Sequence, residues 1–220
     1  MSENGKYVPT DEEQSEFLLY VSYGNEFEID HYLKKGIDPE KIKSPDGCTA
    51  MHIACKCGYP QILEKLLEII KNKSPLSNNG ATLMHISAFN GEIECIKVLI
   101  NYGLESLLCQ NDNYQQQPLH YASKRNHHQI VSFMYDRGLE LDVFDSEGNT
   151  PLHYAAESGS LQFLEALLDR ECDYFLKNKR GDTALHLACL HGELECVKYL
   201  MENGANIKQR NKNNRTGFHL

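Results

Sequence analysis

One short pattern returns at a nearly constant spacing along this chain of 220 residues. Each copy places a histidine directly after an apolar residue, as in TAMHIACKCG, TPLHYAAESG and TALHLACLHG. The histidines of the successive copies are His52, His85, His120, His153, His186 and His219, and the intervals between them are 33, 35, 33, 33 and 33 residues. A fixed period of this length predicts a repeat architecture in which each unit packs only on its neighbours.

Local signals predict a short first helix in each unit. Pro118 and Pro151 stand where a helix would begin, a position at which the missing N–H costs no hydrogen bond. Threonine hydroxyls that can cap the first turn are present at Thr49, Thr82, Thr150, Thr183 and Thr216. About ten residues later a glycine that can end the helix with a positive φ follows at Gly58, Gly91, Gly159 and Gly192.

A second helix follows in each unit, with apolar residues on one face. Leu161, Leu164 and Leu168 show the spacing of i, i+3 and i+7 that places side chains on one side of a helix. Two helices this short cannot bury such a face alone, so neighbouring units must stack.

The T-P-L-H-x-A core with its 33-residue period resembles the ankyrin repeat. The resemblance covers about Lys43 to Leu220, and residues 15–42 fit as a degenerate first unit. It implies an all-α ankyrin-repeat solenoid of helix-turn-helix units with β-turn fingers, and a motif histidine that hydrogen-bonds between adjacent turns. We expect a flexible segment at 1–14 and a single domain at 15–220. Its full repeats would lie at about 43–76, 77–111, 112–144, 145–177 and 178–210, with an incomplete repeat at 211–220.

Two departures from the period are expected to alter the local geometry. The 35-residue interval places two extra residues near Glu105 to Asn113, and the helix ending near Ile70 lacks the usual Gly-Ala turn. At the C-terminal end, NNRTGFHL begins a repeat that stops after about one helical turn. A terminal repeat needs a polar outer face for solubility. We therefore expect either a longer chain or a partner that covers the apolar side of the fifth full repeat.

Composition narrows the class of protein. With 22 Lys and Arg residues against 31 Asp and Glu, the net charge is −9, which disfavours nucleic acid as a general partner. The acidic opening segment is unlike a secretory signal, and no apolar run approaches the about 18 residues of a membrane span. Eight dilute cysteines without zinc-knuckle spacing favour free thiols and a cytoplasmic location, with the nucleus as the alternative.

No catalytic or cofactor motif is present in the sequence. Phosphate-binding glycine loops, HExxH and GxSxG are missing, and six of the ten histidines occupy the repeated motif position. His127 and His128 are adjacent, so on a helix their side chains would diverge rather than bind one ion. Among the cysteines, Cys48, Cys57 and Cys109 lie where a thiol could be exposed, but no activating base recurs beside them. We expect no enzyme activity, no cofactor and no metal.

In the ankyrin family, partners usually bind across the finger tips and the exposed side of the first helices. By register, the candidate partner-binding residues are Asp46, Lys56, Phe89, Asn90, Tyr114, Gln116, Lys124, Arg125, Glu147, Asn149, Glu157, Lys179, Arg180, Asp182 and His191. Without the incomplete sixth unit, this concave strip has five basic and four acidic side chains, whereas the whole chain is strongly acidic. The contrast predicts a protein partner with an acidic or mixed-charge surface.

Three functional hypotheses follow. The first is a monomeric, non-enzymatic adaptor that binds a protein partner along its concave groove, with end-to-end contact at the C-terminal repeat as an additional prediction. The second is a targeting or regulatory ankyrin module of a larger enzyme, channel or receptor. The third rests on one repeat, QPLHYASKRNHHQIVSFMYDRG, which is similar to the gankyrin-like all-ankyrin chaperones that assemble the proteasome regulatory particle.

Overall fold

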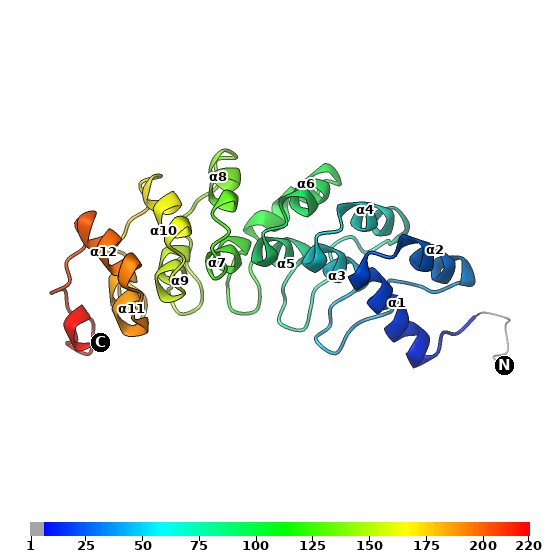
Figure 1. Cartoon of the computed structure of the whole chain (residues 1–220), viewed down its shortest axis with the longest axis horizontal. Coiled ribbons are helices and arrows are strands. Elements are labelled where there is room, and N and C mark those ends of the chain that lie inside the picture. The colour runs from blue at the N-terminus through cyan, green and yellow to red at the C-terminus, as the bar shows by residue number, and fades with distance from the viewer. Residues whose placement is uncertain (1–6) are drawn as a thin grey trace. The chain divides into compact units, whose positions relative to one another are not determined.

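The computed structural model describes residues 7–220, and this part of the chain is built from α-helices and loops with no β-strand (Figure 1). The chain forms two compact units, the first ending at Leu107 and the second beginning at Leu108. Within residues 7–220 no helix is both long and apolar enough to cross a membrane. The expected all-α class with ankyrin-type helix pairs is confirmed.

The first unit contains three antiparallel helix pairs (Figure 1). In chain order its helices are α1 (Asp11–Tyr23), α2 (Glu26–Lys35), α3 (Ala50–Cys57), α4 (Pro60–Ile69), α5 (Leu83–Asn90) and α6 (Ile93–Asn101). Helix α3 packs on α1 and on α5, while α4 packs on α6. Phe17, Ile29, Leu66 and Ile96 are fully buried between these layers. The apolar faces of neighbouring repeats therefore form one core, as the helical spacing predicts.

The second unit repeats the arrangement with shorter helices. They are α7 (Pro118–Ser123), α8 (Gln129–Tyr135), α9 (Pro151–Glu157), α10 (Leu161–Leu168), α11 (Ala184–His191) and α12 (Leu194–Glu202). Helix α9 packs on α7 and α11, and α10 packs on α8 and α12. Two 3₁₀ helices complete the structure, η1 (Glu105–Cys109) in the longer interval and η2 (Gly217–His219), which packs on α11.

The first helix begins earlier than the sequence pattern predicts. Thr10 caps α1 by accepting a hydrogen bond from the Glu13 N–H (3.2 Å), and the Glu13 carboxylate accepts from the Thr10 N–H (2.9 Å). Residues 11–14 are thus helical, and the expected flexible segment at 1–14 is wrong over this part. Residues 1–6 of that segment lie outside the described residues.

The motif histidines join consecutive repeats, as expected. In each, Nδ1 accepts a hydrogen bond from the backbone N–H three residues earlier, for example Thr150 N–H to His153 at 3.1 Å. In His52, His120 and His153 the ring's Nε2–H donates to a carbonyl 29 residues ahead, for example from His153 to Asp182 at 3.0 Å and from His120 to Asn149 at 3.2 Å. His186 donates to the Gln209 carbonyl, 23 residues ahead, at 3.0 Å. Burial lowers the pKa of His120 to about 4, so the ring is neutral at physiological pH.

Candidate protein-interaction surface

Each finger of the second unit is closed by one side chain at its base. The Asp145 carboxylate accepts hydrogen bonds from the backbone N–H groups of Glu147 and Asn149, both at 2.8 Å. The same closure is made by Asp112, Asn178 and Asn211. Carboxylate and amide oxygens that bond the backbone two and four residues ahead hold a turn in one conformation. The tips are therefore ordered without help from a partner.

Neighbouring finger tips are also bonded to each other. Within the second unit, the Ser146 N–H donates to the Tyr114 carbonyl (2.8 Å), and the Lys179 N–H donates to the Glu147 carbonyl (2.9 Å). Gly181 has φ +79°, and a Cβ on it would lie 2.8 Å from the next tip's backbone nitrogen. Only glycine permits this close approach together with a positive φ. In the second unit the tips thus form a row with fixed spacing.

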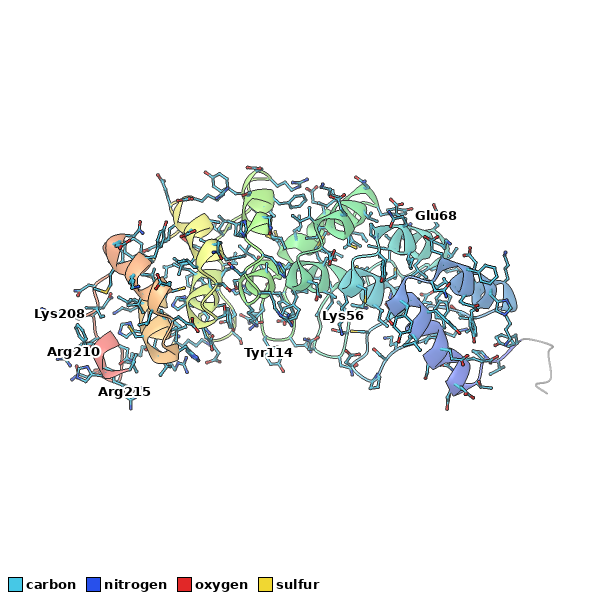
Figure 2. All side chains as sticks on the ribbon, viewed as in Figure 1. Lys56, Glu68, Tyr114, Lys208, Arg210 and Arg215 are labelled. Atoms are coloured by element: carbon cyan, nitrogen blue, oxygen red, sulfur yellow. The ribbon has the colours of Figure 1, made fainter. Side chains whose placement is uncertain are left out.

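Most of the predicted partner-binding residues are accessible. Asp46, Lys56, Tyr114, Arg125, Glu147, Lys179, Arg180 and His191 are exposed, and Phe89, Asn90, Gln116, Lys124 and Glu157 are partly exposed. Figure 2 shows Tyr114 at the end of its loop, directed away from the helices, and its side chain is 58% exposed. His191 and Glu157 lie 3.6 Å apart, between α11 and α9.

Two predicted contact residues are buried, which corrects the sequence-based assignment. The Asn149 side-chain oxygen accepts a hydrogen bond from the Asn178 amide (2.9 Å). Asp182 accepts from the Asn211 amide (2.6 Å) and lies 3.3 Å from Arg180 Nε. Both side chains link the bases of consecutive fingers. They stabilise the row of tips and are not available to a partner.

Lys124 and Gln116 belong to a polar network on the surface of the second unit. The Lys124 ammonium donates to Gln116 Oε1 (2.8 Å) and lies 4.3 Å from the centre of the Tyr154 ring. Gln116 Nε2 donates to the Tyr154 hydroxyl (2.6 Å), which in turn donates to Asp145 (2.6 Å). Burial lowers the pKa of Lys124. Because its ammonium is already engaged, Lys124 is a less available contact than its register position predicts.

Sequence reasoning missed the tyrosine and aspartate members of this network. Tyr121 donates to Asp112 at 2.7 Å, which repeats the bond from Tyr154 to Asp145. In both cases the aspartate precedes the tyrosine by nine residues. That recurring spacing, with the tyrosine directly after the motif histidine, is the signal that could have identified the pair.

Two of the thiols that the sequence places at exposed positions, Cys48 and Cys57, are partly buried. Burial raises the pKa of Cys48 to about 11 and also raises the pKa of Cys57. Both thiols are therefore protonated at neutral pH, whereas a nucleophile must be a thiolate. Within residues 7–220, no three His, Cys, Asp or Glu side chains are grouped so that they could hold a metal ion.

The family model for ankyrin repeats in three copies matches residues 17–108 and 102–178, and the model for the single ankyrin repeat matches residues 180–212. The chain belongs to the ankyrin-repeat family. Ankyrin-repeat domains are protein-interaction modules, and this chain forms such a domain. The fold is typically non-enzymatic.

The curated relatives of this ankyrin-repeat protein are much longer chains. It is 32% identical over 94 residues to human transient receptor potential cation channel subfamily A member 1, covering 42% of this chain and 8% of the channel. It is 30% identical over 121 residues to tyrosine-protein kinase HTK16 of Hydra vulgaris, covering 52% of this chain and 16% of the kinase. The chain thus spans less than a fifth of the length of either relative.

Solved structures agree on the fold. The human ASB11 ankyrin repeat domain is 22% identical, with a TM-score of 0.79 and coverage of 93% of this chain and 90% of that one. The ankyrin repeat domain of Bcl-3 is 23% identical, with a TM-score of 0.68 and coverage of 92% of each chain. At these identities the likeness shows the ankyrin-repeat fold alone.

Proposed function

We propose that this protein is an adaptor that binds a protein partner through the finger tips and the exposed first helices of its repeats. One observation carries the proposal: the tips of the second unit are ordered by bonds at their bases and between neighbours while their side chains stay exposed. A surface that is already ordered loses little conformational entropy on binding.

The partner's surface is acidic or of mixed charge. Tyr114, Arg125, Lys179 and Arg180 are exposed on fingers and first helices of the second unit, with Glu147 among them. Tyrosine and arginine are enriched among the residues that dominate interface energetics. We place the interaction in the cytoplasm, where the eight free thiols would remain reduced.

Photo-crosslinking tests which face binds. A photoreactive phenylalanine analogue replaces Tyr114 at a finger tip or, as a matched control, Tyr135 on the second helix α8, whose side chain is similarly exposed at 51%. We expect a partner from extract of the source cell to crosslink at position 114 and not at 135. Equal crosslinking at both positions, or none at 114, would refute the proposed surface. Proteasome ATPase subunits at position 114 would identify the gankyrin-like role.

The lengths of the relatives favour a second candidate function, that of a targeting or regulatory module within a larger protein. The matched relatives include a channel and a kinase, each several times longer than this chain. An open reading frame that continues past Leu220 through a sixth repeat into a further domain would support this candidate. A transcript with a stop codon directly after Leu220 would exclude it.

A further inference from the structure

Basic side chains are concentrated on the last two fingers of the second unit. Within residues 174–182 and 206–215, seven residues are basic and one is acidic, although the whole chain has a net charge of −9. We call these seven residues the basic finger patch: Lys177, Lys179, Arg180, Lys208, Arg210, Lys212 and Arg215. All seven are exposed.

The charges of the basic finger patch are largely uncompensated. Among residues 7–220, Arg180 is the one member that lies within ion-pair distance of a carboxylate, at 3.3 Å from Asp182. That carboxylate is buried and also accepts a hydrogen bond from Asn211. Like charges held close together raise the local positive potential, which attracts an anionic ligand.

The backbone holds these cations in register. The Lys212 N–H donates to the Arg180 carbonyl (3.1 Å), and the Lys212 ammonium donates to the Lys179 carbonyl (2.7 Å). Asn211 closes the last finger by accepting from the N–H groups of Asn213 and Arg215 at 3.0 and 2.9 Å. Lys179 and Lys212 occupy the same position in successive fingers. The patch is therefore a fixed array rather than a set of independent side chains.

The labelled members of the patch lie together. Figure 2 shows Lys208, Arg210 and Arg215 gathered beside η2 at the C-terminal end of the second unit. Arg210 Nη1 donates to the Asn214 carbonyl (2.8 Å), so this guanidinium is directed along the finger and keeps its other N–H groups for a ligand.

We propose that the basic finger patch binds a short acidic segment of the protein partner, an extended stretch that carries several Asp or Glu residues. This inference rests on the proposed adaptor function and specifies where and by what chemistry the partner is held. Arginine binds carboxylates through paired N–H groups, and side chains on one face of an extended segment recur about every 7 Å. Several carboxylates of one segment can then meet cations on both fingers.

A short protein segment fits this surface better than nucleic acid because the positive region is bounded. Glu147 is exposed at the neighbouring finger tip, where its carbonyl accepts the Lys179 N–H. Glu171 and Asp173, also exposed, precede the patch in the chain. A phosphate backbone that continued from Lys179 to the neighbouring finger tip would meet the Glu147 carboxylate, whereas a few carboxylates on a peptide need not extend so far.

Fluorescence anisotropy tests the proposal on residues 1–220. The probe is a labelled oligoglutamate peptide of about ten residues, roughly 33 Å when extended, with a single-stranded oligothymidylate of similar charge as the alternative ligand. The test variant combines Lys179→Glu with Arg215→Glu, two exposed side chains that make no hydrogen bond within residues 7–220. The matched control combines Lys34→Glu with Lys71→Glu, which changes the net charge equally at exposed positions of the first unit.

We expect the test variant to weaken oligoglutamate binding by about tenfold or more and the control to weaken it by less than about twofold, with binding weaker at high salt. Circular dichroism melting curves confirm that both variants fold. Absence of oligoglutamate binding to the unmodified chain, or an equal effect of both variants, would overturn the inference. Tighter binding of oligothymidylate would assign the patch to nucleic acid instead.

The crosslinking experiment separates this inference from the proposed function. If the partner still crosslinks at position 114 with unchanged yield in the Lys179→Glu, Arg215→Glu variant, the adaptor function stands and the acidic-segment inference fails. If no partner crosslinks at position 114 of the otherwise unmodified chain, the adaptor function itself fails, whatever the peptide results.

Discussion

The two units close their fingers with different chemistry. In the first unit the base of each finger is a serine, and the Ser77 hydroxyl donates to the Ala81 carbonyl (3.2 Å) and accepts a hydrogen bond from the Ala81 N–H (3.1 Å). In the second unit the base is an aspartate or an asparagine, and the Asp145 carboxylate accepts two backbone N–H groups and a tyrosine hydroxyl. A neutral hydroxyl makes weaker bonds than a carboxylate, and Ser77 accepts one backbone N–H where Asp145 accepts two. The two units thus close their fingers with different side-chain bonds, and we expect the closure of the second unit to be the stronger.

The two units also differ in the polar and basic residues that they carry. The residue after the motif histidine is isoleucine in the first unit, at Ile53 and Ile86, but tyrosine in two repeats of the second unit. All six arginines of the chain lie after residue 107. Repeats with the same pattern of buried apolar residues thus differ at exposed positions of the fingers and first helices. Neighbouring tips are bonded in the first unit as well, where the Asn78 N–H donates to the Asp46 carbonyl at 3.0 Å. Because the second unit contains the arginines, we expect it to bind an acidic partner more tightly than the first.

The largest expected effect concerns a feature that the units share. Burial lowers the pKa of His52 and of His120 to about 4, whereas an unfolded histidine titrates near 6.5. As the pH falls from about 7 to 5, the unfolded chain binds protons that the folded chain does not. Each such histidine then removes up to about 1.4 kcal/mol of stability per pH unit below its unfolded pKa.

Hydrogen exchange followed by mass spectrometry checks this pH dependence in each unit separately. We expect amide protection around His52 and around His120 to fall together between neutral pH and pH about 5. Constant protection over this range would contradict the neutral, buried state of the motif histidines. If protection falls in one unit and not in the other, the two units differ in their stability at low pH.

The next effect tests finger closure directly. Replacement Asp145→Ala leaves two backbone N–H groups and the Tyr154 hydroxyl without their acceptor, and we expect a loss of about 3 kcal/mol. The matched Ser77→Ala change in the first unit should cost only about 1 kcal/mol, because Asn79 Oδ1 still accepts the Ala81 N–H (3.3 Å) after the hydroxyl is lost. Urea unfolding measures both. Equal losses would show that carboxylate closure is no stronger than serine closure.

A smaller effect is expected from the tyrosine network. Replacement Tyr154→Phe removes the hydroxyl that bonds Asp145 and Gln116, which should lower the free energy of unfolding by about 1 to 2 kcal/mol. Tyr23→Phe is the control, because Tyr23 is 69% exposed on the first unit and should tolerate the change. Thermal unfolding compares the two. If Tyr154→Phe changes the melting temperature no more than the control does, the network does not stabilise the second unit.

The smallest effect concerns exposed ion pairs, which occur alike in both units. Lys97 pairs with Glu94 and Lys198 pairs with Glu195, each at 2.7 Å and three residues apart on a helix. We expect Lys97→Ala and Lys198→Ala to change the melting temperature by less than about 2 °C, because exposed pairs are weak. A large shift in one unit alone would show that its stability depends on surface charge rather than on finger closure.

The fold could be predicted because its signals are local. The proline that begins α9, the threonine before the first residue of each of α9 and α11 and the glycine that ends α11 each act within one turn of chain, and the period then requires stacking. The Thr150 and Thr183 hydroxyls bond the motif histidine Nδ1 (2.9 and 2.8 Å) instead of a backbone N–H. The start of α1 was placed too late because Thr10 and Glu13 form their capping box outside the repeated pattern.

The sequence by itself determined the repeat period, the helix pairs and which positions stand on the fingers. The tertiary structure decided which polar side chains at those positions turn inward. Asn149 bonds Asn178, and Asp182 bonds Asn211, in each case across 29 residues to the next repeat. The position of a residue within its repeat does not predict such a partner, because the acceptor or donor comes into reach only after two repeats have stacked.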